Sequence, residues 1–109
     1  MTYNEELAKR MRVRLGRLRG LQEKKMFGGI GFLVNGNMAC GVHGKDLIVR
    51  VGDSEYEAAL KRKHVRVFDM SGRPMKGWIT VQEPGYASDE ALQFWIDQSV
   101  RFAKSLAPK

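Results

Sequence analysis

The two side chains best suited to reaction chemistry, Cys40 and His43, lie three residues apart in the chain. A cysteine acts as a nucleophile when it is a thiolate, and it then needs a base within hydrogen-bond reach. The residues around this pair predict a strand, and residues three apart on a strand point to opposite faces. We therefore interpret Cys40 as a buried apolar residue and His43 as a turn residue.

The sequence does not indicate a metal or cofactor site. Its one cysteine and two histidines lack the spacing of zinc ligands. The run Gly28-Gly29-Ile30-Gly31 could suggest a phosphate-binding loop, but such a loop is followed by a helix, and here a strand is expected. We expect no metal, no cofactor and no catalytic residue, and hence a protein that is not an enzyme.

The charge balance points to an anionic partner. Lys and Arg number 19 against 12 Asp and Glu, which gives a net charge of +7. Arg10, Arg14 and Arg17 fall on one flank of a predicted first helix, and Lys24 and Lys25 follow it. These five residues are candidate contacts to phosphate groups or to a partner, although a basic face also serves simply to keep a small domain soluble.

A second candidate site is the turn-rich segment 69–77. Arg66, Arg73 and Lys76 flank it, and polar loops with fixed turn chemistry are common places for binding. The alternative is an ordered surface crossing in which Asp69 pairs with Arg66 or Arg73.

The elements that position these residues are organised around residues 24–51. Asn35-Gly36 lies between two apolar runs and is the strongest short hairpin signal, because a type I′ turn needs two residues that tolerate positive φ. Residues 43–46 then reverse the chain into a third apolar run, 47–51. We predict a three-stranded antiparallel meander, with a bulge or sharp bend at Gly28-Gly29.

Helices are expected before and after the sheet. Residues 2–19 carry apolar side chains every three or four positions, and Gly20 supplies the stop. The last helix begins at residue 88 or 89. Its spacing predicts that Leu92 and Trp95 are buried and that Phe94 is partly exposed.

A short helix at 54–63 and two strands at 65–68 and 78–81 complete the chain. The order α-β-β-β-α-β-β-α predicts an α+β fold in two layers, with one antiparallel five-stranded sheet and the helices on one face. The length fits a single domain, 1–109. No apolar run approaches the roughly 20 residues of a membrane span, and residues 1–6 lack the pattern of a signal peptide. We expect a cytoplasmic protein that does not contact a membrane.

Several of these segments, taken in order, resemble a known family. They are Lys25-Met26-Phe27-Gly28-Gly29-Ile30-Gly31-Phe32, Asn35-Gly36, Leu47–Val51, the Gly-Trp-Ile and Pro-Gly pieces at 77–85, and the Leu-x-x-Trp of the last helix. The chain resembles the TfoX/Sxy N-terminal domain family, and Met-Phe-Gly-Gly is the most specific part. We interpret the matched motif residues as structural: Met26, Phe27, Gly28, Gly29, Gly31, Asn35 and Gly36.

The resemblance implies a bacterial domain linked to natural competence. Such a domain is thought to act as a transcriptional coactivator with a cyclic-AMP receptor-type activator. Two-domain members add a helical C-terminal domain, whereas this chain ends at Lys109 and resembles the stand-alone form. The family brings no catalytic residues to transfer.

Two hypotheses follow for the partner. The first is a non-enzymatic regulatory module that contacts a protein, either a transcription factor or an RNA polymerase component, with nucleic acid secondary. On this hypothesis the chain is a monomer or a weak homodimer, and Phe94 would supply the self-association surface. The alternative is a direct nucleic-acid-binding protein that uses the basic first helix.

Overall fold

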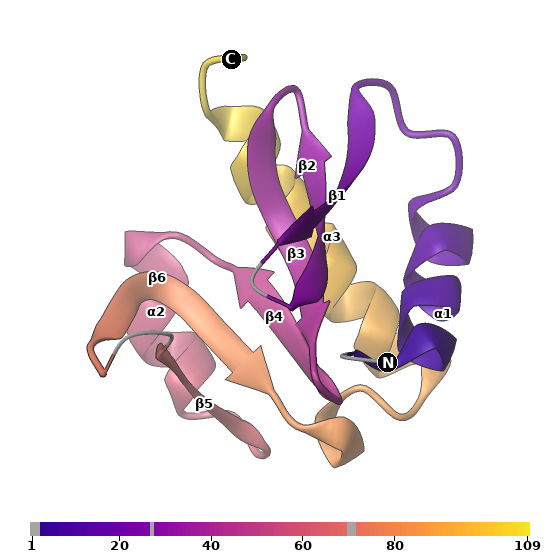
Figure 1. The fold of residues 1–109 in the computed structure, drawn as a ribbon. Helices are drawn as coiled ribbons and strands as arrows, with labels where there is room; N and C mark the ends of the chain where they lie inside the picture. Colours follow the sequence, from indigo (N-terminus) through magenta and orange to yellow (C-terminus); the bar gives the residue numbers. More distant parts are fainter. Residues whose placement is uncertain (1–2, 27, 70–71) are drawn as a thin grey trace.

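In the described part of the chain, one antiparallel sheet of six strands carries three α-helices on one face (Figure 1). The computed structural model describes residues 3–26, 28–69 and 72–109. The strands are β1 (Leu21–Met26), β2 (Gly29–Val34), β3 (Asn37–His43), β4 (Asp46–Arg50), β5 (Val65–Asp69) and β6 (Pro74–Val81), in the spatial order β1-β2-β3-β4-β6-β5. The helices are α1 (Glu5–Leu15), α2 (Asp53–Leu60), the single 3₁₀ turn η1 (Glu83–Gly85) and α3 (Asp89–Ser105).

The α+β class is therefore confirmed, but the prediction of five strands is wrong. The additional strand is β1, which pairs along its whole length with β2 from Leu21↔Val34 to Met26↔Gly29. Its central residues are charged or polar and exposed, so no apolar alternation announces it. The element order thus has four strands, not three, between α1 and α2.

The glycine pair plays a different part from the one expected. Gly28, at φ 75°, lies in the turn between β1 and β2, and Gly29 is the first residue of β2. The irregularity predicted at this pair occurs further along, between Phe32 and Leu33 in the β2–β3 ladder. Phe27 lies outside the described residues.

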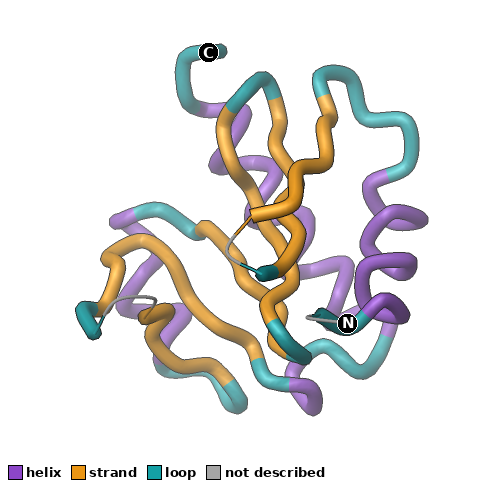
Figure 2. The backbone as a smooth tube through the Cα atoms, viewed as in Figure 1, coloured by secondary structure: helices purple, strands orange, loops and turns teal. Residues whose placement is uncertain are grey.

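The Asn35-Gly36 hairpin is confirmed as a two-residue turn. Asn35 and Gly36 have φ values of 55° and 83°, and the next residues out, Val34 and Asn37, are paired. The C-terminal segment docks on this turn: the Lys109 amide donates to the Asn35 carbonyl oxygen at 2.8 Å. Figure 2 shows the loop at the end of this hairpin beside the C-terminus.

Helix α1 is shorter than predicted. The Asn4 side chain accepts a hydrogen bond from the Leu7 amide at 3.1 Å and caps its start. The helix ends at Leu15, because Gly16 takes the left-handed conformation at φ 58°. The apolar spacing continues to Leu18, which packs on the core from the following loop, and this made the helix look longer.

The three helices cover one face of the sheet. Helix α3 runs behind β2, β3 and β4, and α2 lies behind β5 and β6 (Figure 1). In α3, Leu92 and Trp95 are buried while Phe94 is 42% exposed, as predicted. No helix in the described ranges is long and apolar enough to cross a membrane.

A row of side chains across the sheet forms the centre of the core. Phe32, Cys40, Val49 and Ile79 are successive register partners on β2, β3, β4 and β6, and all four are fully buried. They join residues of all three helices in one apolar cluster. Burial of this face against the helices is the main force that holds the two layers together.

Candidate functional site

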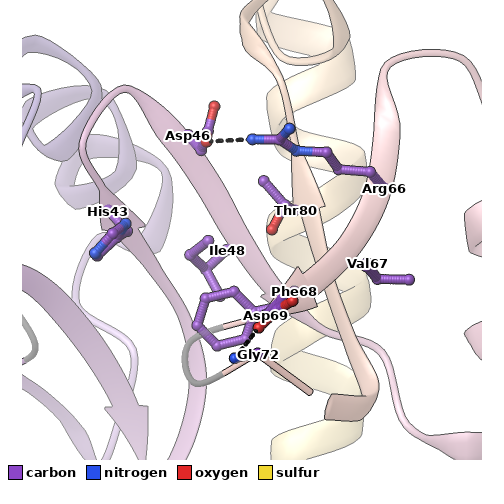
Figure 3. Close-up of a pocket in the computed structure, with 9 residues that line it drawn as sticks. All are labelled: His43, Asp46, Ile48, Arg66, Val67, Phe68, Asp69, Gly72 and Thr80. Atoms are coloured by element: carbon purple, nitrogen blue, oxygen red, sulfur yellow. Dashed lines mark hydrogen bonds and ion pairs between the residues drawn. The ribbon is translucent and has the colours of Figure 1, made fainter. Parts of the chain in front are cut away.

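The other face of the sheet carries no helix, and a pocket of about 620 Å³ opens on it (Figure 3). It is lined by His43, Asp46, Ile48, Arg66, Val67, Phe68, Asp69, Gly72 and Thr80. These residues come from the end of β3, from β4, β5 and β6, and from the segment after β5. The pocket volume is in the range of small-ligand sites, roughly 300–1,000 Å³.

The strand register explains how distant residues meet here. One row of partners crosses all six strands: Lys24, Gly31, Gly41, Ile48, Thr80 and Arg66. Because side chains alternate across a strand, this row faces away from the helices. Ile48 and Thr80 form the pocket floor, and Arg66 rises at its edge.

On strands β2 and β3, positions of this face include the glycines Gly29 and Gly41, which carry no side chain. A Cβ atom added at Gly41 would lie 2.5 Å from the Ile30 carbonyl oxygen, and one added at Gly29 would meet the Val42 carbonyl oxygen even more closely. The strands β2 and β3 therefore approach too closely for side chains at these positions. Of the motif glycines, Gly29 takes part in this close approach, whereas a Cβ atom at Gly28 would meet nothing within 4 Å.

Charges of both signs ring the pocket. The Arg66 guanidinium lies 3.4 Å from an Asp46 carboxylate oxygen across the pocket mouth. The Arg66 side chain is 61% exposed and that of Asp46 is 22% exposed. An exposed pair of this length contributes about 1 kcal/mol or less to stability, so Arg66 can exchange Asp46 for a ligand at little cost.

A short-range hydrogen bond joins Asp69, at the end of β5, to Gly72. The Asp69 carboxylate accepts a hydrogen bond from the Gly72 amide at 2.6 Å. The alternative pairing of Asp69 with Arg66 or Arg73 does not occur among the described residues: Arg66 pairs with Asp46, and Asp69 forms no ion pair there. Short-range turn bonds of this kind compete well with distant charge partners.

Three cations were predicted to form a site around segment 69–77, and only one of them lines the pocket. Arg66 lines it, whereas Arg73 and Lys76 are exposed and do not. Strand β6 begins at Pro74, earlier than the expected residue 78. The predicted loop is therefore shorter, and Lys76 lies on a strand.

The basic flank of α1 is engaged within the molecule. Arg10 and Arg14 both contact the Asp89 carboxylate at the start of α3, at 3.3 and 2.9 Å. Their hydrogen bonds lower the pKa of Asp89. Arg17 lies beyond the end of α1 and is exposed. The arginines predicted to act as one face are therefore divided between two environments.

The remaining predicted cations lie on the edge strand β1. Lys24 and Lys25 are both exposed, and their register partners Gly31 and Ile30 belong to opposite faces of the sheet. Only Lys24 therefore belongs to the open face. Charged residues on an edge strand also hinder unwanted pairing with other chains.

Cys40 lies in the core and not in the pocket. Burial raises the pKa of its thiol to about 12, so the thiolate is strongly disfavoured. His43 ends β3, pairs in register with Asp46 and lines the pocket. Among the described residues, no group of three or more His, Cys, Asp or Glu side chains is placed to hold a metal ion.

The fold and this face define a small two-layer α+β domain with a shallow, mixed-charge pocket on the open side of its sheet. The family model of the TfoX N-terminal domain matches residues 14–103, and the chain belongs to this family. The resemblance found from the motifs is thereby confirmed. No curated protein and no solved structure matches the chain.

Most of the pocket was not foreseen from the sequence. Ile48 and Thr80 look like ordinary strand residues, and Asp46 looks like a turn residue. The available signal was the parity of each strand, since Ile48 and Thr80 both alternate with core residues. The alternation of side chains within each strand does not reveal which strands lie next to one another in the sheet.

Proposed function

We propose that this chain is a regulatory module that acts through protein–protein contacts and does not catalyse a reaction. The observation that carries the proposal is the match to the TfoX N-terminal domain over residues 14–103. By the resemblance, the partner is a cyclic-AMP receptor-type activator or RNA polymerase, and the process is natural competence.

The open face supports a binding role. Phe68, which is half-buried, offers apolar surface for a partner side chain above the buried Ile48, and Arg66 and Asp46 supply polar groups at its edge. An apolar centre within a polar rim is the usual composition of a protein interface. Among the described lining residues no nucleophile is hydrogen-bonded to a base, so we assign the pocket to binding.

The proposal is tested with purified proteins. The immobilised chain is exposed to a cyclic-AMP receptor-type activator, with and without cyclic AMP and promoter DNA, and separately to RNA polymerase. We expect saturable binding to one of them and its loss in Arg66→Glu, which places two like charges at the pocket mouth.

The matched control is Arg101→Glu, because Arg101 is an exposed arginine on α3, away from the open face. It should bind as the wild type does. Equal loss in both variants would point to net charge alone. A failure of the wild type to bind either protein would refute the proposed function.

A further inference from the structure

A second basic surface lies in the turn between α2 and β5. Four consecutive basic residues, Lys61–His64, occupy this turn, and all four are exposed. None of them forms an ion pair with a carboxylate in the described part of the chain. This differs from α1, where Arg10 and Arg14 share an ion pair with Asp89.

The backbone of this turn is held in one conformation. The amides of Lys61 and Arg62 donate to the carbonyl oxygens of Ala58 and Ala59 at 3.2 and 3.1 Å. At the other end the Gln82 amide donates to the His64 carbonyl oxygen at 2.8 Å. Cations carried on an ordered backbone lose less conformational freedom when an anion binds.

An exposed aromatic ring lies directly beside these cations. The Arg62 guanidinium is 4.4 Å from the centroid of Phe94 and 5.4 Å from that of Trp95. Phe94 and Trp95 meet edge to face at 5.0 Å. Trp95 is buried, whereas Phe94 is 42% exposed. The Arg62 guanidinium therefore lies against the exposed Phe94 ring, and the buried Trp95 supports that ring edge to face.

A hollow of about 400 Å³ connects the stack to the basic turn. Its lining includes Arg62, Lys63 and His64 from the turn and Phe94 and Trp95 from α3. One ligand in this hollow would therefore meet a flat π-surface and positive charge at the same time. Flat aromatic rings and negative charge occur together, in regular alternation, in a nucleic acid strand.

We propose that this surface binds single-stranded nucleic acid. A base stacks on the Phe94–Arg62 pair, and the adjacent phosphates contact Lys61 and Lys63. Unpaired bases commonly stack on aromatic rings and on arginine planes in such sites. A duplex keeps its bases stacked on one another and could use only the charges, so we expect the single strand to bind better. This site is independent of the open-face pocket.

Acidic residues limit the site on its other side. Asp89, Glu90 and Asp97 lie beside Phe94 on the side where Arg14 also contributes. Glu90 and Asp97 are exposed and repel phosphate there. The strand must therefore run along the 61–64 side of the ring, and the footprint is a few nucleotides.

The test is fluorescence anisotropy with labelled eight-nucleotide oligo-dT and oligo-rU and a duplex of equal length, at several salt concentrations. The double variant Lys61→Gln/Lys63→Gln should flatten the salt dependence of single-strand affinity, by about 0.7 in log–log slope for each phosphate that is no longer neutralised. Phe94→Leu should weaken binding on the order of tenfold without changing the slope, because stacking carries no charge. Phe94→Trp should restore it. The dT and rU arms show whether the 2′-hydroxyl contributes.

The matched control is Arg101→Gln/Lys104→Gln, which removes two exposed charges elsewhere. It should leave affinity and slope close to those of the wild type, and thermal melts establish that all variants are folded. The proposal is overturned if the wild type does not bind, if the control loses as much as the Lys61/Lys63 variant, or if Phe94→Leu binds as the wild type does. Loss with Phe94→Leu at an unchanged slope in the Lys61/Lys63 variant would also overturn it, because the phosphates would then not contact these lysines.

Discussion

Two adjacent rows of residues cross the same six strands and serve opposite purposes. One row contains Phe32, Cys40, Val49 and Ile79, all fully buried under the helices. The next contains Gly31, Gly41, Ile48 and Thr80, with Lys24 and Arg66 at its ends, and it faces the open side. The first row holds the layers together. The second lies on the face without helices, where its middle residues are buried and Lys24 and Arg66 at its ends are exposed.

The largest effect should come from the covered row. Replacing Phe32 with Ala leaves a large cavity under the helices and should destabilise the domain by about 3–5 kcal/mol. Chemical denaturation measures the change. Leu33→Ala is the neighbouring control, because Leu33 is only half-buried and should cost clearly less. Equal losses would show that the covered face is not the core.

Gly41 is the next most sensitive position, although it lies on the open row. A Cβ atom there would press on the Ile30 carbonyl oxygen at 2.5 Å, so Gly41→Val should cost about 1–3 kcal/mol by forcing β2 and β3 apart. His43→Val, on the exposed end of the same strand, should cost little. A Gly41→Val protein with an unchanged melting temperature would contradict the close approach of these strands.

A matched exchange between the rows sharpens the comparison. Val49→Thr places a hydroxyl in the apolar core and should cost about 1–3 kcal/mol. Thr80→Val is the opposite exchange on the other face. Thr80 is only 5% exposed, but its hydroxyl forms no side-chain hydrogen bond among the described residues, so this change should cost clearly less than Val49→Thr. Thermal melts of the two variants give the answer directly. If Thr80→Val were the more damaging, the assignment of the two faces would be reversed.

These comparisons show what the sequence could and could not supply. The Asn35-Gly36 turn and the buried face of α3 were predictable because they depend on local conformation and helical spacing. Strand β1 was missed because its charged residues suit an edge and not a core. The end of α1 was missed because Leu18 continues the apolar spacing after the helix has stopped.

Both candidate binding surfaces required the structure. Arg66 reaches Asp46 because β4 and β5 both pair with β6, an arrangement that no local pattern reveals. The basic turn at 61–64 looked like an ordinary helix end until Phe94, about thirty residues later, was placed beside Arg62. The sequence predicted a binding surface on the basic flank of α1, yet two arginines of this flank contact Asp89 within the molecule.

The smallest predicted effect concerns that contact. Arg10 and Arg14 lower the pKa of Asp89 below its ordinary value of 3.8. A lowered pKa in the folded state means that this carboxylate stabilises the fold above the unfolded-state pKa. The contribution is lost as pH falls through the folded-state value. NMR titration should show the pKa of Asp89 rising in Arg14→Gln and staying low in Arg17→Gln.

The most direct test of the account maps the partner contact on the two faces. The ¹⁵N-labelled chain is titrated with whichever protein binds it, the cyclic-AMP receptor-type activator or RNA polymerase, and backbone amide shifts are followed. We predict that the perturbed amides cluster around the open-face pocket, at His43, Ile48, Arg66 and Thr80, while those of α1 and α3 change little. Perturbations confined to the helices, with the pocket amides unmoved, would contradict the claim that the open face is the interaction surface.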